Sequence, residues 1–122
     1  MTFREILQRL VEDTPGALAA VLMGSDGIPI DDYRSAGARI DLPALAVEFQ
    51  RVLEEARKAS SALYPDARGR LAELILNTTE NQLLFREVDE EYFVVIALEP
   101  TGSLGKARYL MRSLLRDLQR EL

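Results

Sequence analysis

The residue types that usually perform chemistry are scarce in this chain. Its 122 residues include no histidine and no cysteine, which removes the commonest general base, the commonest metal ligand and all thiolate chemistry. A serine or threonine nucleophile would have no histidine to activate it. Nothing in the sequence places two carboxylates in one pocket. We therefore predict a protein that is not an enzyme and that uses no cofactor and no metal.

One segment is spaced like a phosphate-binding loop, because Gly102-Ser-Leu-Gly-Lys106 follows an apolar run and precedes a helical pattern. A P-loop needs glycine where Pro100 stands and serine or threonine where Ala107 stands. Without these residues the loop lacks the freedom to cradle phosphates and the hydroxyl that holds Mg²⁺. The sequence instead favours a plain turn, with Ser103 as the N-cap of the last helix. We expect Gly105 to let that helix approach the preceding strand closely.

Charged residues gather in three places, and each has a functional and a structural interpretation. The two acidic groups could bind Mg²⁺ or Ca²⁺, but neither has the spacing of a calcium loop, so we expect a polar strand and a solvated turn. The arginines recur every fourth residue on the last helix, where they either face solvent or dock an acidic partner. The acidic groups are Asp31-Asp32 and Glu87 with Asp89, Glu90 and Glu91; the arginines are Arg108, Arg112, Arg116 and Arg120.

The overall composition limits the class of protein and partner. The net charge of −5 argues against nucleic acid or an anionic membrane as a partner. The N-terminal residues are too polar for a signal peptide, and no apolar run is long enough for membrane insertion. With 48% hydrophobic and 29% charged residues, the chain is expected to form a single cytoplasmic domain over residues 1–122.

Apolar periodicity predicts the order helix, two strands, helix, three strands, helix. A capping box at Thr2 begins the first helix, and Thr14-Pro15-Gly16 ends it. Apolar runs at Ala17–Met23 and Tyr92–Leu98 predict central strands that are buried on both faces. Pro29 lacks an N–H, so the strand over 28–33 belongs at a sheet edge. The remaining strands are expected at 70–78 and 82–88, before a last helix that begins at residue 104.

The longest helix is predicted to begin after Asp41 and to end at Tyr64-Pro65-Asp66. We expect its apolar stripe to lie on the sheet and its charged side to face outward. The stripe comprises Leu42, Leu45, Phe49, Val52, Leu53, Ala56 and Leu63; the charged side comprises Glu48, Arg51, Glu54, Glu55, Arg57 and Lys58.

Two segments resemble those of the Roadblock, or dynein light chain, family. Ala17-Leu-Ala-Ala-Val-Leu-Met-Gly-Ser-Asp-Gly-Ile-Pro-Ile30 resembles the first hairpin of Roadblock domains. Leu98-Glu-Pro-Thr-Gly-Ser-Leu-Gly-Lys-Ala-Arg108 resembles the end of their last strand and the entry to their final helix. The order of elements agrees over nearly the whole chain. The resemblance implies an α+β, profilin-like fold with a five-stranded antiparallel sheet in the order 2-1-5-4-3. The long helix would cover one face and the terminal helices the other.

The resemblance also implies how the chain would assemble. The family includes dynein light chains and the bacterial polarity proteins MglB and MglC, and its members dimerise and scaffold or regulate Ras-like GTPases. In the implied homodimer the third strands pair edge to edge and the long helices lie side by side. Activation of a GTPase by this family would not use an inserted arginine finger. The predicted dimer interface comprises Glu73, Leu74, Ile75 and Leu76 with Ala56, Ala59 and Ala62.

Three functions remain open at this point. We favour a non-catalytic adaptor in an MglA-type GTPase module, which binds another Roadblock protein, the GTPase or both, because the charged long helix and the end at Leu122 differ from MglB. The second is a direct GTPase-activating partner. The third is a profilin- or longin-like module that holds a small ligand between sheet and helix. The predicted partner-binding residues are Glu48, Arg51, Glu55, Arg108, Arg112 and Arg116.

Overall fold

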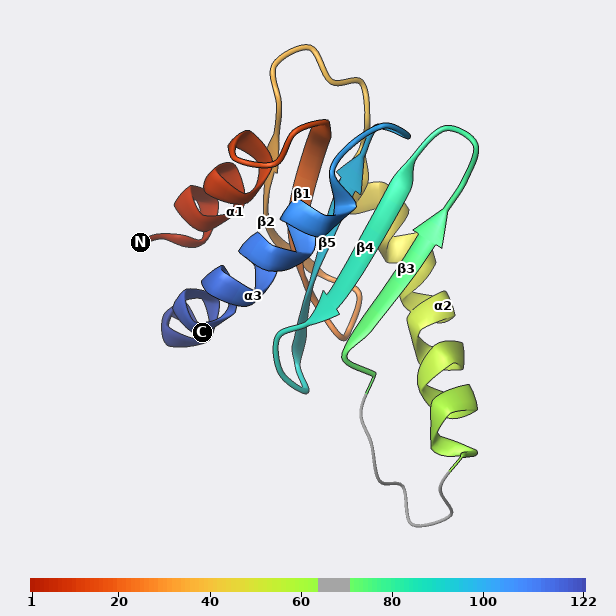
Figure 1. Cartoon of the computed structure of the whole chain (residues 1–122). Helices are drawn as coiled ribbons and strands as arrows, with labels where there is room; N and C mark the ends of the chain where they lie inside the picture. Colours follow the sequence, from red (N-terminus) through yellow and green to blue (C-terminus); the bar gives the residue numbers. More distant parts are fainter. Residues whose placement is uncertain (64–70) are drawn as a thin grey trace.

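The computed structural model describes residues 1–63 and 71–122, and its elements follow the predicted order (Figure 1). The helices are α1 (Phe3–Glu12), α2 (Leu42–Ser61) and α3 (Leu104–Glu121). The strands are β1 (Ala17–Gly24), β2 (Pro29–Arg34), β3 (Glu73–Asn77), β4 (Gln82–Glu87) and β5 (Tyr92–Leu98). They form one antiparallel sheet in the order β2-β1-β5-β4-β3. The predicted α+β fold and strand order are therefore confirmed.

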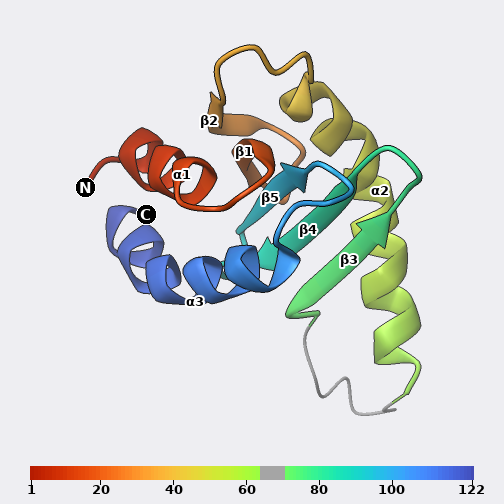
Figure 2. The same cartoon turned by 45° about the horizontal axis from the view of Figure 1, so that its top comes forward.

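Helices cover both faces of the sheet, as Figure 2 shows. α1 and α3 pack on one face, and α2 packs on the other. Side chains alternate between the faces along each strand, so β5 contributes Val94 and Ile96 to the α1 and α3 side and Phe93 and Val95 to the α2 side. All four side chains are buried. The structure thus confirms that β5 is a central strand buried on both faces.

Short polar side chains begin each helix at the predicted position. The N-caps are Thr2, Asp41 and Ser103. In each case the side-chain oxygen accepts a hydrogen bond from the backbone N–H three residues later, at distances of 3.1, 3.2 and 3.3 Å respectively. These bonds satisfy donors that have no partner within the helix, and they explain why the helix starts could be predicted from the sequence.

The predicted close approach of a glycine was assigned to the wrong residue. A Cβ atom added at Gly105 would meet nothing within 4 Å. The close approach instead joins Gly16 and Gly102, since a Cβ at Gly16 would lie 2.5 Å from the Cα of Gly102. Gly16 also has a φ of +81°, which disfavours any residue with a side chain. The backbone N–H of Glu99 donates to the Gly16 carbonyl at 2.8 Å and ties the two loops together.

α2 and β3 differ in detail from the prediction. Val52 and Leu63 were expected in the buried stripe of α2, but they are 40% and 74% exposed. Val52 lies on the side of α2 that faces away from the sheet, although its neighbour Leu53 is buried. Leu63 comes just after α2, whose C-terminal part extends past the strands (Figure 1). The stop predicted at residues 64–66 lies outside the described residues, as does residue 70. β3 begins at Glu73 rather than at residue 70.

Candidate interaction surfaces

β3 forms one edge of the sheet, and half of its backbone groups point outward. Just before β3 the N–H of Glu87 donates to the Ala72 carbonyl at 3.1 Å, and just after it the N–H of Thr78 donates to the Asn81 carbonyl at 2.8 Å. Because backbone direction alternates along an antiparallel strand, the odd-numbered positions of β3 direct their N–H and C=O groups away from β4. Such a row of groups is a template for a further strand.

The side chains of β3 divide between the two faces of the sheet. Leu74 and Leu76 pack into the core under α2. Glu73 and Ile75 point to the other face, where Glu73 forms ion pairs and Ile75 is 39% exposed. A strand added at this edge would bond to the backbone of β3, and its side chains would lie beside the two leucines on one face and beside Glu73 and Ile75 on the other.

The outer side of α2 mixes small, apolar and charged residues. Ala56 is half-buried, whereas Ala59 and Ala62 are exposed in the part of α2 that passes the strands. The exposed small and apolar side chains would permit close approach of another helix. The other exposed residues on this side include Val47, Glu48, Arg51, Val52 and Glu55.

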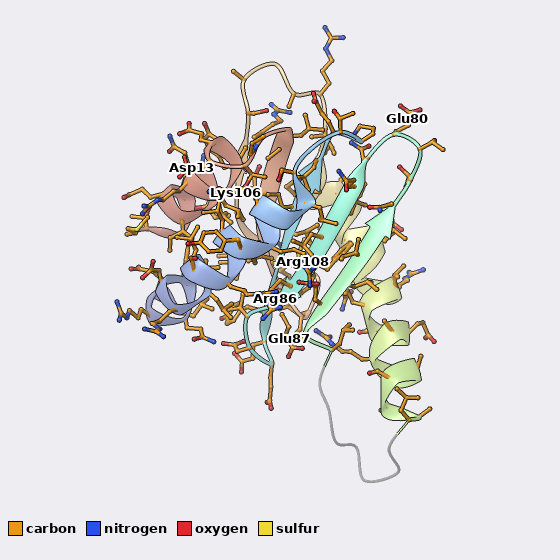
Figure 3. The ribbon with its side chains drawn as sticks, viewed as in Figure 1. Asp13, Glu80, Arg86, Glu87, Lys106 and Arg108 are labelled. Carbon is orange, nitrogen blue, oxygen red and sulfur yellow. The ribbon has the colours of Figure 1, made fainter. Side chains whose placement is uncertain are left out.

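The arginines of α3 do not form one uniform stripe. Arg108 Nη2 lies 2.9 Å from Glu73 Oε1, and Arg86 Nη1 lies 3.5 Å from the other Glu73 oxygen. Figure 3 shows Arg86 and Arg108 converging at the β3 side of α3. The structure thus joins Glu73, predicted for the dimer interface, to Arg108, predicted for partner binding. Arg112 and Arg116 are exposed, as expected for a surface that meets solvent or a partner.

The predicted partner-binding residues fall on two surfaces. α2 and α3 lie on opposite faces of the sheet (Figure 2), so the three charged residues of α2 and the three arginines of α3 cannot contact one partner element together. The spacing of charged residues within one helix could not predict this separation, because the face on which a helix packs depends on how the chain connects the strands.

An apolar patch at the β2 edge of the sheet was not predicted from the sequence. It consists of Ile28 and Ile30, which are 62% and 40% exposed. They border a shallow cavity of about 320 Å³ that Glu91 and Tyr92 also line. The register of β1 and β2 shifts between Leu22 and Met23, which is the local irregularity of a β-bulge. The sequence feature that could have predicted this patch is the pair of isoleucines two residues apart at the start of a mostly polar edge strand.

The turn before α3 is built as a cap rather than as a phosphate cradle. The Gln82 amide donates to the carbonyls of Glu99, Pro100 and Gly102 at 3.1, 3.2 and 3.0 Å. These bonds hold carbonyl oxygens, which repel phosphate, against β4. Ser103 is occupied as the N-cap of α3.

The space between the middle of α2 and the sheet is filled, whereas an open pocket of about 470 Å³ lies at the start of α2 beside Ala19 and Asp32. The cavity lined by Leu53, Phe85 and Phe93 holds about 10 Å³, about the space of one water molecule. Phe49 packs on Phe85 with ring centroids 5.7 Å apart. The described residues thus offer no chamber for a small ligand at this place.

The part of the chain that the structure describes contains neither a metal site nor a membrane-spanning helix. No group of three or more acidic side chains is arranged to hold a metal ion there. None of the described helices is long and apolar enough to cross a membrane.

One hydrogen bond between side chains ties the edge strand β2 to α1. The Tyr33 hydroxyl donates to Glu12 Oε1 at 2.8 Å. This bond raises the pKa of Tyr33 above its ordinary value of 10.0, with smaller contributions from burial and from the charge of Glu12. The shift follows because the bond requires the protonated hydroxyl.

An open edge strand, exposed helix faces and a filled interior are typical of small α+β interaction domains. The comparisons with known proteins agree with this class. Residues 3–97 match the family model of the Roadblock/LC7 domain, and the chain therefore belongs to the Roadblock/LC7 family, as its sequence resemblance predicted. No curated protein sequence matched the chain.

Solved structures of bacterial Roadblock proteins are similar to the chain. It is similar to MglC from Myxococcus xanthus, with 32% identity, complete coverage of both chains (100% each) and a TM-score of 0.74. It shares its fold with the gliding protein MglB from Thermus thermophilus, with 24% identity over 96% of this chain and 85% of that chain and a TM-score of 0.81. A Roadblock/LC7 domain from Streptomyces avermitilis also shares the fold, with 14% identity, 98% and 97% coverage and a TM-score of 0.83.

Proposed function

We propose that this protein is a non-catalytic dimeric adaptor in a polarity or motility module of a Ras-like small GTPase. It acts by binding another Roadblock protein, the GTPase or both. The observation that carries the proposal is the likeness to MglC over the full length of both chains at 32% identity. The filled space between the middle of α2 and the sheet favours this function over a small-ligand sensor.

The dimer in this proposal pairs β3 with its copy and brings the two α2 helices together. Three outward positions on each of two strands would form at most about six hydrogen bonds, each worth about 1 kcal/mol net. Association costs at least about 4 kcal/mol, so strand pairing needs support from apolar burial. Val52 on α2 and Leu63 just after it, at 40% and 74% exposed, would supply this apolar surface.

Direct activation of a GTPase is the second candidate. The sequence is 24% identical to MglB from Thermus thermophilus and 32% identical to MglC. The lower identity to MglB makes direct activation the second candidate rather than the first. The exposed charged side of α2, with Glu48, Arg51 and Glu55, would be the contact surface for the GTPase. We expect GTP neither to bind to the purified protein nor to be hydrolysed by it alone.

The test uses the purified full chain with the purified Roadblock paralogues and Ras-like GTPases of its source organism. Light scattering coupled to gel filtration gives the mass of the chain alone and of each mixture, and GTP hydrolysis is measured in parallel. A dimer that binds a Roadblock paralogue and leaves hydrolysis unchanged supports the adaptor. Binding to the GTPase with faster hydrolysis supports the second candidate. Failure to bind any of these proteins contradicts both.

A further inference from the structure

A strip of the sheet beside α3 is left uncovered by any described helix. In both views α3 runs over the middle of the sheet, and β3 lies beyond it on that face (Figures 1 and 2). The strip contains the ion cluster of Glu73, Arg86 and Arg108. It also contains Ile75 on the floor and Arg112 on the wall, one helical turn after Arg108. We call these five residues the basic strip.

The ion cluster holds two guanidinium groups against the one carboxylate that they share. The side chains of Glu73 and Arg86 are 16% and 22% exposed, and that of Arg108 is 41% exposed. Strand alternation places Glu87 on the α2 face, where it lines the small cavity with Arg57. Positive charge that is partly removed from water is costly unless it is balanced, so the cluster favours a second carboxylate.

The hydrogen-bonding capacity of the cluster is also incompletely used. Each guanidinium carries five N–H donors, and Glu73 offers two oxygens. The Nε atoms of Arg86 and Arg108 are buried and have no hydrogen-bond partner among the described residues. Native structures rarely leave buried donors unpaired. An acceptor from another protein would reach the exposed parts of the two side chains, which are 22% and 41% exposed, rather than the buried Nε atoms.

The rest of the strip adds an apolar contact and a free cation. Ile75 is 39% exposed, on the same face as Glu73. Arg112 is exposed and forms no ion pair within the part of the chain that the structure describes. On α3 it follows Arg108 by four residues, so the two side chains lie on the same side of the helix.

We propose that the basic strip docks an acidic amphipathic segment of another protein. In this arrangement the segment's carboxylates pair with Arg108 and Arg112, and its apolar side chains cover Ile75. A protein segment fits better than nucleic acid, because the chain carries a net charge of −5 and the strip has an apolar floor. The proposal does not depend on the proposed dimer, since β3 would use its outward backbone groups for pairing and its side chains for docking.

The experiment titrates the isotope-labelled full chain with a short blocked helical peptide that has glutamates on one side and leucines on the other. A peptide with glutamine in place of every glutamate serves as the neutral control. The expected result is a shift of the arginine Nε–H signals of Arg86 and Arg108 and of the Ile75 methyl signals with the glutamate peptide only. Shifts confined to other residues, or equal shifts with the glutamine peptide, would overturn the proposal.

Arginine variants separate local pairing from general attraction. Arg112→Gln removes no contact within the described fold, and we expect it to weaken peptide binding about tenfold, as the loss of one charge-assisted hydrogen bond implies. Arg120→Gln is the matched control. It removes the same charge two turns further along α3, where Arg120 meets Asp117 at 3.8 Å, and should leave affinity within about twofold of the native chain. Equal weakening by both variants, or tighter binding of a single-stranded oligonucleotide to the same strip, would contradict the proposal.

Discussion

Gly16 lies where two loops cross, and the backbone of Gly102 leaves no room for a side chain there. We expect Gly16→Ala to lower the free energy of unfolding by about 1–3 kcal/mol, because the new Cβ meets the backbone of Gly102 and the positive φ strains the chain. Gly105→Ala is the control, since its Cβ would enter open space. This change should leave stability equal or raise it by up to about 1 kcal/mol. Urea unfolding followed by circular dichroism, at one protein concentration, measures both. Equal stability of the two variants would show that the crossing tolerates a side chain.

A single hydroxyl offers a test by pH. The bond from Tyr33 to Glu12 raises the pKa of Tyr33, so we expect Glu12→Gln to lower it. The folded state holds this proton to higher pH than the unfolded state does. The hydrogen bond of Tyr33 therefore contributes fully to stability below pH 10.0, the ordinary pKa of a tyrosine. This contribution is lost as pH rises through the pKa of Tyr33 in the folded state. Ring signals of Tyr33 in NMR spectra report the titration directly. Glu5→Gln on the same helix should not move it, and a shift as large as that of Glu12→Gln would refute the assigned cause.

At the scale of elements, local signals were sufficient to predict the order and type of helices and strands. Thr2, Asp41 and Ser103 are short polar caps that act within their own turn, and the apolar runs of β1 and β5 are buried whatever their neighbours. Errors arose where distant segments decide the outcome. Leu63 is exposed because the chain has passed the edge of the sheet at that point. A side chain at Gly105 would meet nothing, because the opposing loop contacts Gly102 instead.

The edge strand β3 carries the prediction that belongs to an element. Ile75 occupies an outward backbone position, so Ile75→Pro removes an N–H that β4 does not use, while the central strands keep their bonds. We expect this variant to become monomeric at micromolar concentration and to keep most of its circular dichroism signal. Ile75→Thr keeps the N–H and should remain dimeric. Light scattering gives the mass of each. A folded proline variant that stays dimeric would place the interface elsewhere.

At the scale of the whole molecule, the candidate sites could be predicted only in part. The arginines of α3 and the charges of α2 were found from spacing along each helix, but the sheet separates them onto opposite faces. The ion pair of Arg108 with Glu73 joins residues far apart in the sequence. Only the strand order brings them together, and no local pattern carries that information.

The two edges of the sheet are separate surfaces, and this separation gives a last prediction. Ile28 lies at the β2 edge, so its replacement should affect a partner without affecting a dimer formed through β3. We expect Ile28→Ser to weaken binding of the Roadblock paralogue about tenfold or more, because an isoleucine buried at an interface contributes about 1.5–3 kcal/mol.

Serine removes the apolar surface without adding a charge beside Asp26 and Glu91, and the backbone hydrogen bonds of Ile28 in the turn do not involve its side chain. Leu122→Ser is the matched control, since Leu122 is 40% exposed at the far end of α3. Calorimetric titration gives the affinities, and light scattering gives the mass of each variant alone. Unchanged affinity of Ile28→Ser, together with a loss of binding in Arg51→Glu, would move the contact from the β2 edge to α2.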